Sequence, residues 1–300
     1  MYRRYVWLTV TAASSLACSM VLKTNENQCA TDDDCKARGA LMANAVCREQ
    51  VCVDREKADG GEKPDAGGVG AWSCLGKVVW EAPAQPQVVV TMNFVDLVAK
   101  LPVANLSVRP CAKMDVVCAN PLGPAVTTDQ NGLATLTLPA SFDGYAEVVS
   151  STVADAGSTS IVPTLVFFNP PPNKDLHYGT VPTFTPPALA ALAAGHGNTV
   201  DPSLGFLFSG AMDCSGKPAA GVSWDPDRIL EATRRFYYVD GLPSEAAVST
   251  DATGYGGFIN MPTGTIRLFV KIQATGLAVG ETSVFVRAGH LSTGFLVPTP

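Results

Sequence analysis

Thr128-Asp-Gln-Asn-Gly-Leu-Ala-Thr-Leu-Thr-Leu-Pro139 is the stretch that decides the fold. Thr250-Asp-Ala-Thr-Gly-Tyr-Gly-Gly-Phe-Ile-Asn-Met-Pro262 repeats its pattern later in the chain. In each copy an Asp and a Gly bound a tight turn, because the Asp side chain accepts from nearby backbone N–H groups and the Gly can take φ > 0. We predict structural turn roles for four residues: Asp129, Gly132, Asp251 and Gly254.

Short apolar or alternating runs, separated by Gly, Pro, Asn and Asp, extend on both sides of these turns. This pattern is typical of all-β proteins. The candidate strands are 77–80, 88–92, 105–108, 133–138, 145–149, 164–168, 205–208, 221–224, 236–239, 257–260, 266–272 and 283–286. A second weak repeat, 102–108 against 218–224, indicates two copies of one β module.

These motifs together resemble the carboxypeptidase regulatory-like, or prealbumin-like, β-sandwich. The resemblance rests on Pro102-Val, Thr128-Asp129 and Gly144-Tyr145 in the first copy, and on Gly221-Val222 and Thr250-Asp251 in the second. It implies a mainly β chain with two Ig-like sandwiches, which in that family usually stabilise, space or adhere and rarely catalyse. The sandwiches are expected at 72–168 and 201–300.

The segment between the two sandwiches, residues 169–200, is expected to be a Pro-rich connector with one short helix. Asn169-Pro-Pro-Pro172 is stiff and extended. Pro186 to Gly195 has Pro at its start, Gly at its end and an Ala/Leu interior, which predicts a helix.

Composition limits the function classes. A chain of 300 residues with 47% hydrophobic content can bury a sizeable core, and two domains with appendages are the natural expectation. The net charge of −6 provides no basic stripe to neutralise phosphates and no polybasic membrane patch. We therefore expect no nucleic-acid partner.

The N-terminus has the features of an export signal at 1–17. Arg3 and Arg4 precede an apolar run from Tyr5 to Ala13, and Ser15-Leu-Ala-Cys18 forms the cleavage zone. Ala17-Cys18 resembles the end of the bacterial lipoprotein signal, which implies lipidation of Cys18 and contact with the membrane only through that lipid. The protein would then belong to the cell envelope, at the outer membrane or cell surface. An ordinary cut after Ala17, which would release the chain, is the alternative.

Nine cysteines behind an export signal indicate an oxidising compartment. If lipidation uses Cys18, eight remain, which fits four disulfides. Four lie close together in an expected module at 29–53, between an anchored tether at 18–28 and a Gly-rich flexible linker at 54–71: Cys29, Cys35, Cys47 and Cys52. Spacing leaves their connectivity open, and a zinc site is the alternative to crosslinks. The run from Cys29 to Cys35 resembles segments of small Cys-rich modules in secreted proteins of myxobacteria.

The other four cysteines suggest two further bridges. Cys111 and Cys118 bracket six residues in an expected loop, and a bridge there would brace it. Cys74 and Cys214 then remain, and a bond between them would lock the two sandwiches together.

No catalytic or cofactor motif is present in the sequence. The three histidines have no second His or Cys at metal-ligand spacing, and no H-E-x-x-H, G-x-S-x-G, P-loop or G-x-G-x-x-G occurs. We therefore expect a non-catalytic protein with no cofactor and no metal, which presents its sandwiches for adhesion, assembly or ligand contact. The expected partner is an unknown envelope or surface molecule, and a glycan is one candidate.

Two alternative functions remain open at this stage. One is a carbohydrate-binding accessory module of a secreted hydrolase system, and the other is an enzyme with an unrecognised site. The candidate ligand-contact residues are Trp224, Tyr237 and Tyr238 in the second sandwich and Trp80 in the first, and the alternative for each is a place in the core.

Overall fold

The computed structural model describes residues 29–37, 45–48, 51–54, 70–150 and 160–300. The chain divides into two compact units, Met1–Pro64 and Asp65–Pro300. The expected signal, the lipid-anchored tether and nearly all of the expected linker lie outside the described residues. The predictions of those segments therefore stay predictions.

The first unit is small and Cys-rich. It contains helix α1 (Asp32–Lys36) and a hairpin of β1 (Ala45–Arg48) and β2 (Val51–Asp54), in which Cys47 lies opposite Cys52. Asp32, Asp33 and Asp34 form the first turn of α1. The Asp34 carboxylate accepts from the backbone N–H groups of Ala30 and Thr31, both at 2.8 Å. An acidic first turn also suits the positive end of a helix.

The second unit is mainly β, and its strands form three sheets. A short 3₁₀ helix, η2 (Gly70–Trp72), precedes them. The strands up to the connecting helix are β3 (Gln87–Asp96), β4 (Leu106–Ala112), β5 (Val126–Thr127), β6 (Leu133–Pro139), β7 (Gly144–Ser150), β8 (Thr164–Phe167) and β9 (Leu176–Thr183). After helix α3 (Pro186–Gly195) come β10 (Gly205–Ala211), β11 (Val222–Pro226), β12 (Arg234–Val239), β13 (Leu242–Ser244), β14 (Tyr255–Met261), β15 (Gly264–Ile272), β16 (Ala278–Val286) and β17 (Leu291–Leu296).

The mainly β fold with two sandwiches, a Cys-rich module and a short connecting helix is confirmed. One nine-stranded sheet, in the order β13-β12-β14-β10-β17-β8-β7-β4-β5, runs through both sandwiches. The two are joined because the last strand, β17, pairs in parallel with β10 on one side and with β8 on the other. The domain boundaries at 169–200 stay a prediction, since the sheet is continuous across the two halves.

The two small sheets cover opposite faces of the nine-stranded sheet. Alternate residues of β8 separate the cores: Leu165 and Phe167 pack with the β11-β15-β16 side, whereas Val166 packs with the β6-β3-β9 side. This follows from the two-residue side-chain period of a strand. The second unit is therefore a three-layer structure with one hydrophobic core on each side of the nine-stranded sheet. A further hydrophobic core lies under α3.

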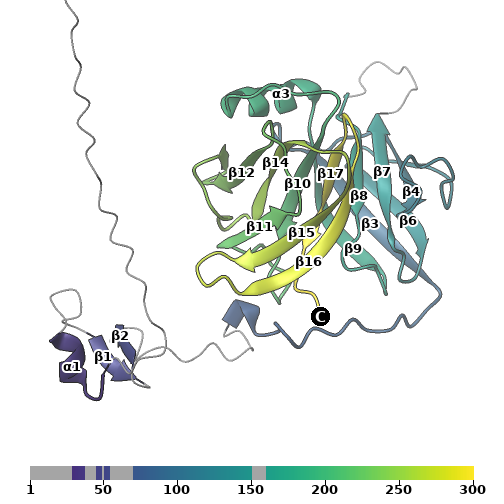
Figure 1. Cartoon of the computed structure of the whole chain (residues 1–300). Helices are drawn as coiled ribbons and strands as arrows, with labels where there is room; N and C mark the ends of the chain where they lie inside the picture. The colour runs from purple at the N-terminus through teal and green to yellow at the C-terminus, as the bar shows by residue number, and fades with distance from the viewer. Residues whose placement is uncertain (1–28, 38–44, 49–50, 55–69, 151–159) are drawn as a thin grey trace, which may run out of the picture. The chain divides into compact units, whose positions relative to one another are not determined.

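The helix at Pro186–Gly195 is confirmed, and its start is explained by an N-cap. The Thr185 hydroxyl accepts from the backbone N–H of Ala188 at 3.3 Å, and Pro occupies the first turn. Leu189 is buried and Leu192 packs beside it against aromatic residues on the outer face of β10 and β12. Figure 1 shows α3 lying across the ends of these strands.

Some strand predictions were incomplete. The run 77–80 is unpaired, and the strands β9 and β17 were not predicted. Part of the expected connector, Leu176–Thr183, is β9, which pairs in parallel with β3 and completes the small sheet of the first sandwich. Gly179 and Pro182 interrupt the apolar alternation in the sequence of β9, and Gly294 interrupts it in the sequence of β17. Neither strand therefore has the usual strand pattern.

Candidate functional site

The repeated Thr-Asp-x-x-Gly turns have matching geometry in the two sandwiches. The Asp129 carboxylate accepts from the backbone N–H groups of Asn131 and Leu133 at 2.9 and 2.8 Å. The Asp251 carboxylate accepts from the backbone N–H and hydroxyl of Thr253 at 2.9 and 2.5 Å. Their predicted structural roles agree with these contacts.

The glycines of these turns are required by the backbone. Gly132 and Gly254 both have φ of +73°, and a Cβ at either position would meet a backbone oxygen, Phe94 O at 2.3 Å or Ala211 O at 2.6 Å. A side chain is therefore excluded by strain and by contact. These residues belong to the fold and not to a ligand site.

The threonine that opens each turn has a role that sequence reasoning missed. The buried Thr128 hydroxyl donates to Val103 O and accepts from Leu106 N–H, both at 2.9 Å. The buried Thr250 hydroxyl makes the equivalent pair with Ala219 O and Val222 N–H at 2.7 and 3.0 Å. Each hydroxyl thus holds its turn against the start of the strand that follows Pro102 or Pro218, which is β4 or β11. The repetition of Thr in both turns was the sequence signal for this role.

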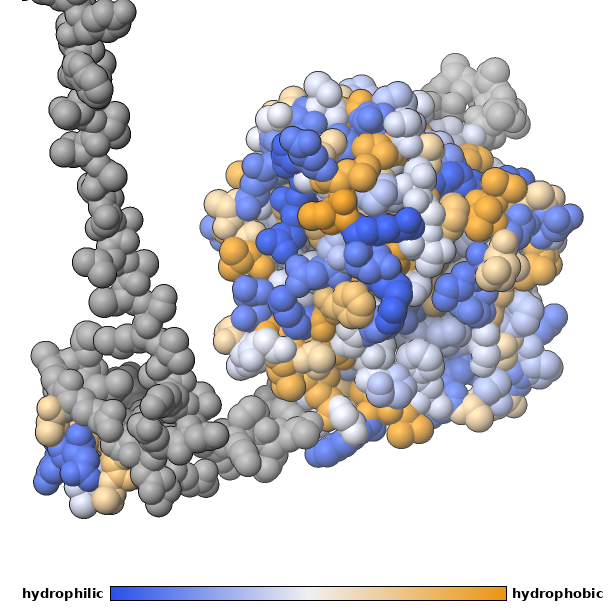
Figure 2. All heavy atoms as spheres, viewed as in Figure 1, coloured by the Kyte–Doolittle hydropathy of each residue, from blue (hydrophilic) through white to orange (hydrophobic). Residues whose placement is uncertain are grey.

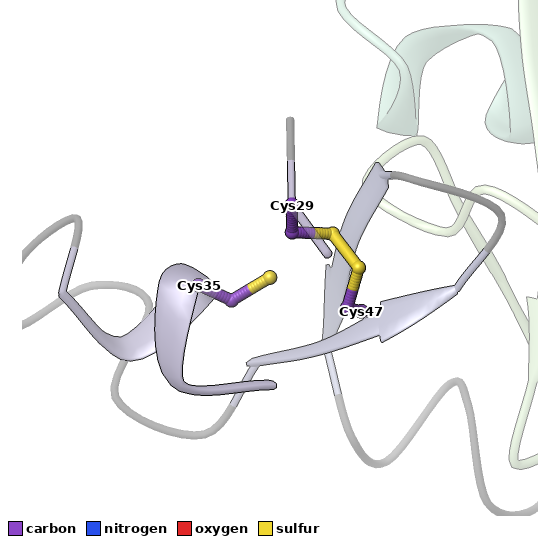
Figure 3. A group of neighbouring side chains, drawn as sticks. All are labelled: Cys29, Cys35 and Cys47. Carbon is purple, nitrogen blue, oxygen red and sulfur yellow. A yellow bond between two sulfur atoms is a disulfide. The ribbon is translucent and has the colours of Figure 1, made fainter. Parts of the chain in front are cut away.

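The cysteine clusters are oxidised. Cys29 and Cys47 form a disulfide with an S–S distance of 2.04 Å, and the Cys35 sulfur lies close to them and is also disulfide-bonded (Figure 3). A disulfide sulfur is not the thiolate that zinc binds. For these three residues the crosslink interpretation holds over the zinc alternative. Cys18 and the side chain of Cys52 lie outside the described residues.

The two predicted bridges of the second unit are present, Cys111–Cys118 and Cys74–Cys214. Cys74 belongs to the segment around η2, where Leu75 is buried in the core of the second sandwich and Cys214 N–H donates to Ala71 O at 2.9 Å. This bridge therefore fixes the segment that leads to the first strand, β3, onto the second sandwich.

The three predicted ligand-contact aromatics of the second sandwich lie in the protein interior, which corrects that prediction. Trp224 and Tyr237 have no exposed surface, and Tyr238 is 8% exposed. The Tyr237 hydroxyl accepts from the Trp224 backbone N–H at 3.0 Å, and the two rings form an edge-to-face pair with centroids 5.0 Å apart. Tyr238 packs under α3, where burial raises its pKa to about 12. Strand alternation places these rings in cores, so they present no face to a ligand.

A buried ion-pair network lies at the seam between the two sandwiches. Glu147 on β7 has a side chain only 4% exposed, and it pairs with Arg109 on β4 and with Arg287 just after β16. Arg287 also donates to the Tyr145 hydroxyl at 3.0 Å. Because Glu147 is held by cations from both sandwiches, we interpret the network as structural.

The network was not predicted from sequence, although a signal existed. Arg109 and Glu147 are charged residues inside apolar strands and lie opposite each other in the β4–β7 register. A charged pair at such positions is typical of buried partners.

His290 next to this network has a lowered pKa. Desolvation by burial is the main cause, and the Arg287 guanidinium acts in the same direction. Arg287 Nη1 lies 3.3 Å from His290 Nε2, and His290 Nδ1 lies 2.7 Å from Ala288 O. The neutral ring therefore fits, with Nδ1–H donating to the carbonyl and Nε2 accepting from Arg287.

We expect this histidine to make the stability pH-dependent. Since its folded pKa is below the unfolded value of about 6.5, the unfolded chain binds more protons in that window, and the free energy of unfolding falls as pH is lowered through 6.5. His290→Gln should flatten the stability profile between about pH 7 and pH 5 in urea titrations. His177→Gln, the same substitution at an exposed position, is the matched control. An unaltered slope in His290→Gln would contradict the assignment.

Among the described residues, Trp80 has an aromatic side chain that is largely accessible and lies beside surface hollows. Trp80 is 46% exposed and lines two cavities, of about 310 and 380 Å³. On the face shown in Figure 2, other hydrophobic residues are scattered among hydrophilic ones and form no single continuous patch. The sequence analysis placed Trp80 in a strand, and the structure leaves it unpaired and exposed, in agreement with its candidate role as a contact residue.

The fold and these surfaces define a rigid double β-sandwich protein with structural disulfides. No family model matches the sequence, and no curated protein matches it. The chain is similar in structure to the Bacillus anthracis TIE protein, a streptococcal ancillary pilin and the minor pilin of Streptococcus agalactiae, with TM-scores of 0.22, 0.24 and 0.22 and identities of 13%, 12% and 16%.

These alignments cover 72%, 74% and 71% of this chain and 34%, 66% and 98% of those chains, respectively. The chain thus spans about a third of the first protein and about two thirds of the second. At such TM-scores the likeness supports no conclusion about function. Within the described residues, no helix is both long and apolar enough to cross a membrane.

Proposed function

We propose that this chain is a non-catalytic cell-envelope lipoprotein that holds a rigid double sandwich outside the cytoplasm for contact with a ligand or partner. The observation that carries the proposal is the fusion of both sandwiches through one nine-stranded sheet. A sheet shared in this way resists hinge motion between the halves. Such a unit suits presentation of a fixed surface more than closure around a substrate.

The titratable groups of the second unit also support a structural role. Its most buried carboxylate, Glu147, is neutralised by two arginines, and the Asp251 and Asp129 carboxylates are used in turns. Asp251 has a lowered pKa; burial opposes the shift, but hydrogen bonds from Thr253 outweigh it. Groups held this way are poor general acids or bases at neutral pH.

Lipidation of Cys18 is the feature that would place the protein in the envelope. We expect the wild-type chain, expressed in a Gram-negative host, to fractionate with membranes and to carry diacylglyceryl on an N-terminal Cys18. Cys18→Ser should move it to the soluble fraction, because one or no acyl chain gives only marginal binding. Mass spectrometry of the mature N-terminus reads the modification directly.

The double variant Cys111→Ser/Cys118→Ser is the matched control, since it removes two sulfurs without touching the N-terminus and should remain in the membrane fraction. An unmodified Cys18 at the mature N-terminus, together with a soluble wild-type protein, would overturn the anchor and favour free secretion.

A further inference from the structure

Trp80 lines two hollows on the surface of the second unit. One hollow is lined by the ends of β4, β7 and β8 and by Glu281, Thr282 and Ser283 of β16, so it lies where the two sandwiches meet. The other is lined by Ser141, Lys174 and the Pro170–Pro171 segment. Trp80 and Pro171 line both hollows, which therefore adjoin each other, and we call them together the Trp80 cleft.

The segment that carries Trp80 is held in place although it is not a strand. The Asn173 side chain donates to Glu81 O at 2.8 Å, and the Gln85 side chain donates to Asp175 at 3.0 Å. Ala140 N–H donates to Pro86 O at 3.0 Å. The backbone next to Trp80 is therefore held against the segment that follows the proline run, which reduces the backbone entropy lost on binding.

The rim of the Trp80 cleft is polar and carries charges of both signs. It contains three carboxylates and two lysines: Asp143, Glu281, Glu81, Lys113 and Lys174. Glu281 pairs with Arg267 at 2.6 Å. Asp143 pairs with Lys113 at 3.1 Å, but its side chain is 63% exposed and retains accessible acceptor positions. Hydroxyl and amide groups of Ser283, Ser141 and Asn169 add further donors and acceptors.

We propose that the Trp80 cleft binds a neutral oligosaccharide. An exposed indole offers an apolar, electron-rich face to the C–H groups of a sugar ring, and carboxylate, amide and hydroxyl groups around it match sugar hydroxyls. Two adjoining hollows that share one indole suit a chain of several sugar rings better than a single small molecule. This inference rests on the proposed function only in that the chain meets glycans outside the cytoplasm.

Other ligand classes fit the cleft less well. Acidic polymers are disfavoured, since the rim has no excess of positive charge and the chain has a net charge of −6. A purely apolar ligand would cut the charged rim groups off from water, which costs free energy. A neutral, hydroxyl-rich chain satisfies both the indole and the rim.

The test is binding of the purified full chain, in a detergent without a sugar head group, to an array of neutral and acidic oligosaccharides of four or more rings. Titration of each hit follows tryptophan fluorescence and calorimetric heat. We expect at least one neutral hit and no preference for acidic glycans. Trp80→Ala should weaken that binding about tenfold or more, and Trp80→Phe should retain most of it because it keeps an aromatic face.

Leu242→Ala is the matched control, since Leu242 is 71% exposed on the distant edge strand β13 and its loss should leave binding unchanged. The inference is overturned if no neutral oligosaccharide binds at millimolar concentration, if acidic glycans are preferred, or if Trp80→Ala binds as the wild type does. These outcomes are independent of the Cys18 experiment, because the anchor is read by fractionation and mass and the cleft is read by binding.

Discussion

Replacing Cys74 and Cys214 together by serine should lower the free energy of unfolding by about 5 kcal/mol. The bridge closes a loop with a sequence separation of 140 residues, and the entropy that a crosslink removes from the unfolded chain grows with loop length. It also fixes the η2 segment, with the buried Leu75, onto the second sandwich. Urea unfolding of oxidised protein, followed by tryptophan fluorescence, measures the loss.

Cys111→Ser/Cys118→Ser is the matched control for this prediction. Its bridge spans a separation of only 7 residues, so the same entropy model gives a loss of about 2.5 kcal/mol. Equal losses for the two double variants, or a larger loss for the short loop, would show that chain entropy is not the main contribution of the Cys74–Cys214 bridge.

Trp224→Ala should destabilise the protein by about 3–5 kcal/mol, the cost of removing a large aromatic from a core. Trp224 has no exposed surface, and its edge-to-face contact with Tyr237 would be lost with it. The cavity would open between β11 and the nine-stranded sheet, where the neighbouring strands cannot close it. Thermal and urea unfolding both report the change.

Trp80→Ala is the comparison that makes this prediction specific, since it removes the same side chain from a surface position. We expect it to change the free energy of unfolding by less than about 1 kcal/mol, as for most substitutions at exposed sites. Similar destabilisation by both variants would contradict the assignment of Trp224 to the core and of Trp80 to the surface cleft.

The local elements of the fold followed from sequence, and their joining did not. The Thr-Asp-x-x-Gly turns and the α3 helix were readable because each depends on contacts within a few residues, such as Asp129 with Asn131 or Thr185 with Ala188. The joining strand β17 was missed because Ser292, Thr293 and Gly294 give no alternating apolar signal. A Cβ at Gly294 would approach Phe167 O to 3.0 Å, so a larger residue there would crowd the backbone of β8.

Some features of the candidate sites could be predicted from the sequence, and others only from the structure. Cysteine count and spacing were enough to predict the Cys111–Cys118 and Cys74–Cys214 bridges. Composition could not say which aromatics are exposed, because burial depends on which layer covers each strand face. Trp224 and Trp80 were therefore equal candidates for ligand contact, and only the structure shows that Trp224 is buried while Trp80 lies at the surface cleft.

The sequence by itself determined the β class, the two repeated modules, the connecting helix and the two cysteine pairs of the second unit, since these are encoded in local periodicity, turn chemistry and counting. Only the tertiary structure decided that both sandwiches share one sheet, that Glu147 is held by Arg109 and Arg287 across the seam, and that Trp80 faces a cleft. Those features depend on contacts between residues far apart in the chain. The shared sheet in particular forms because β17 pairs with both β10 and β8, and no local pattern in the chain specifies that pairing.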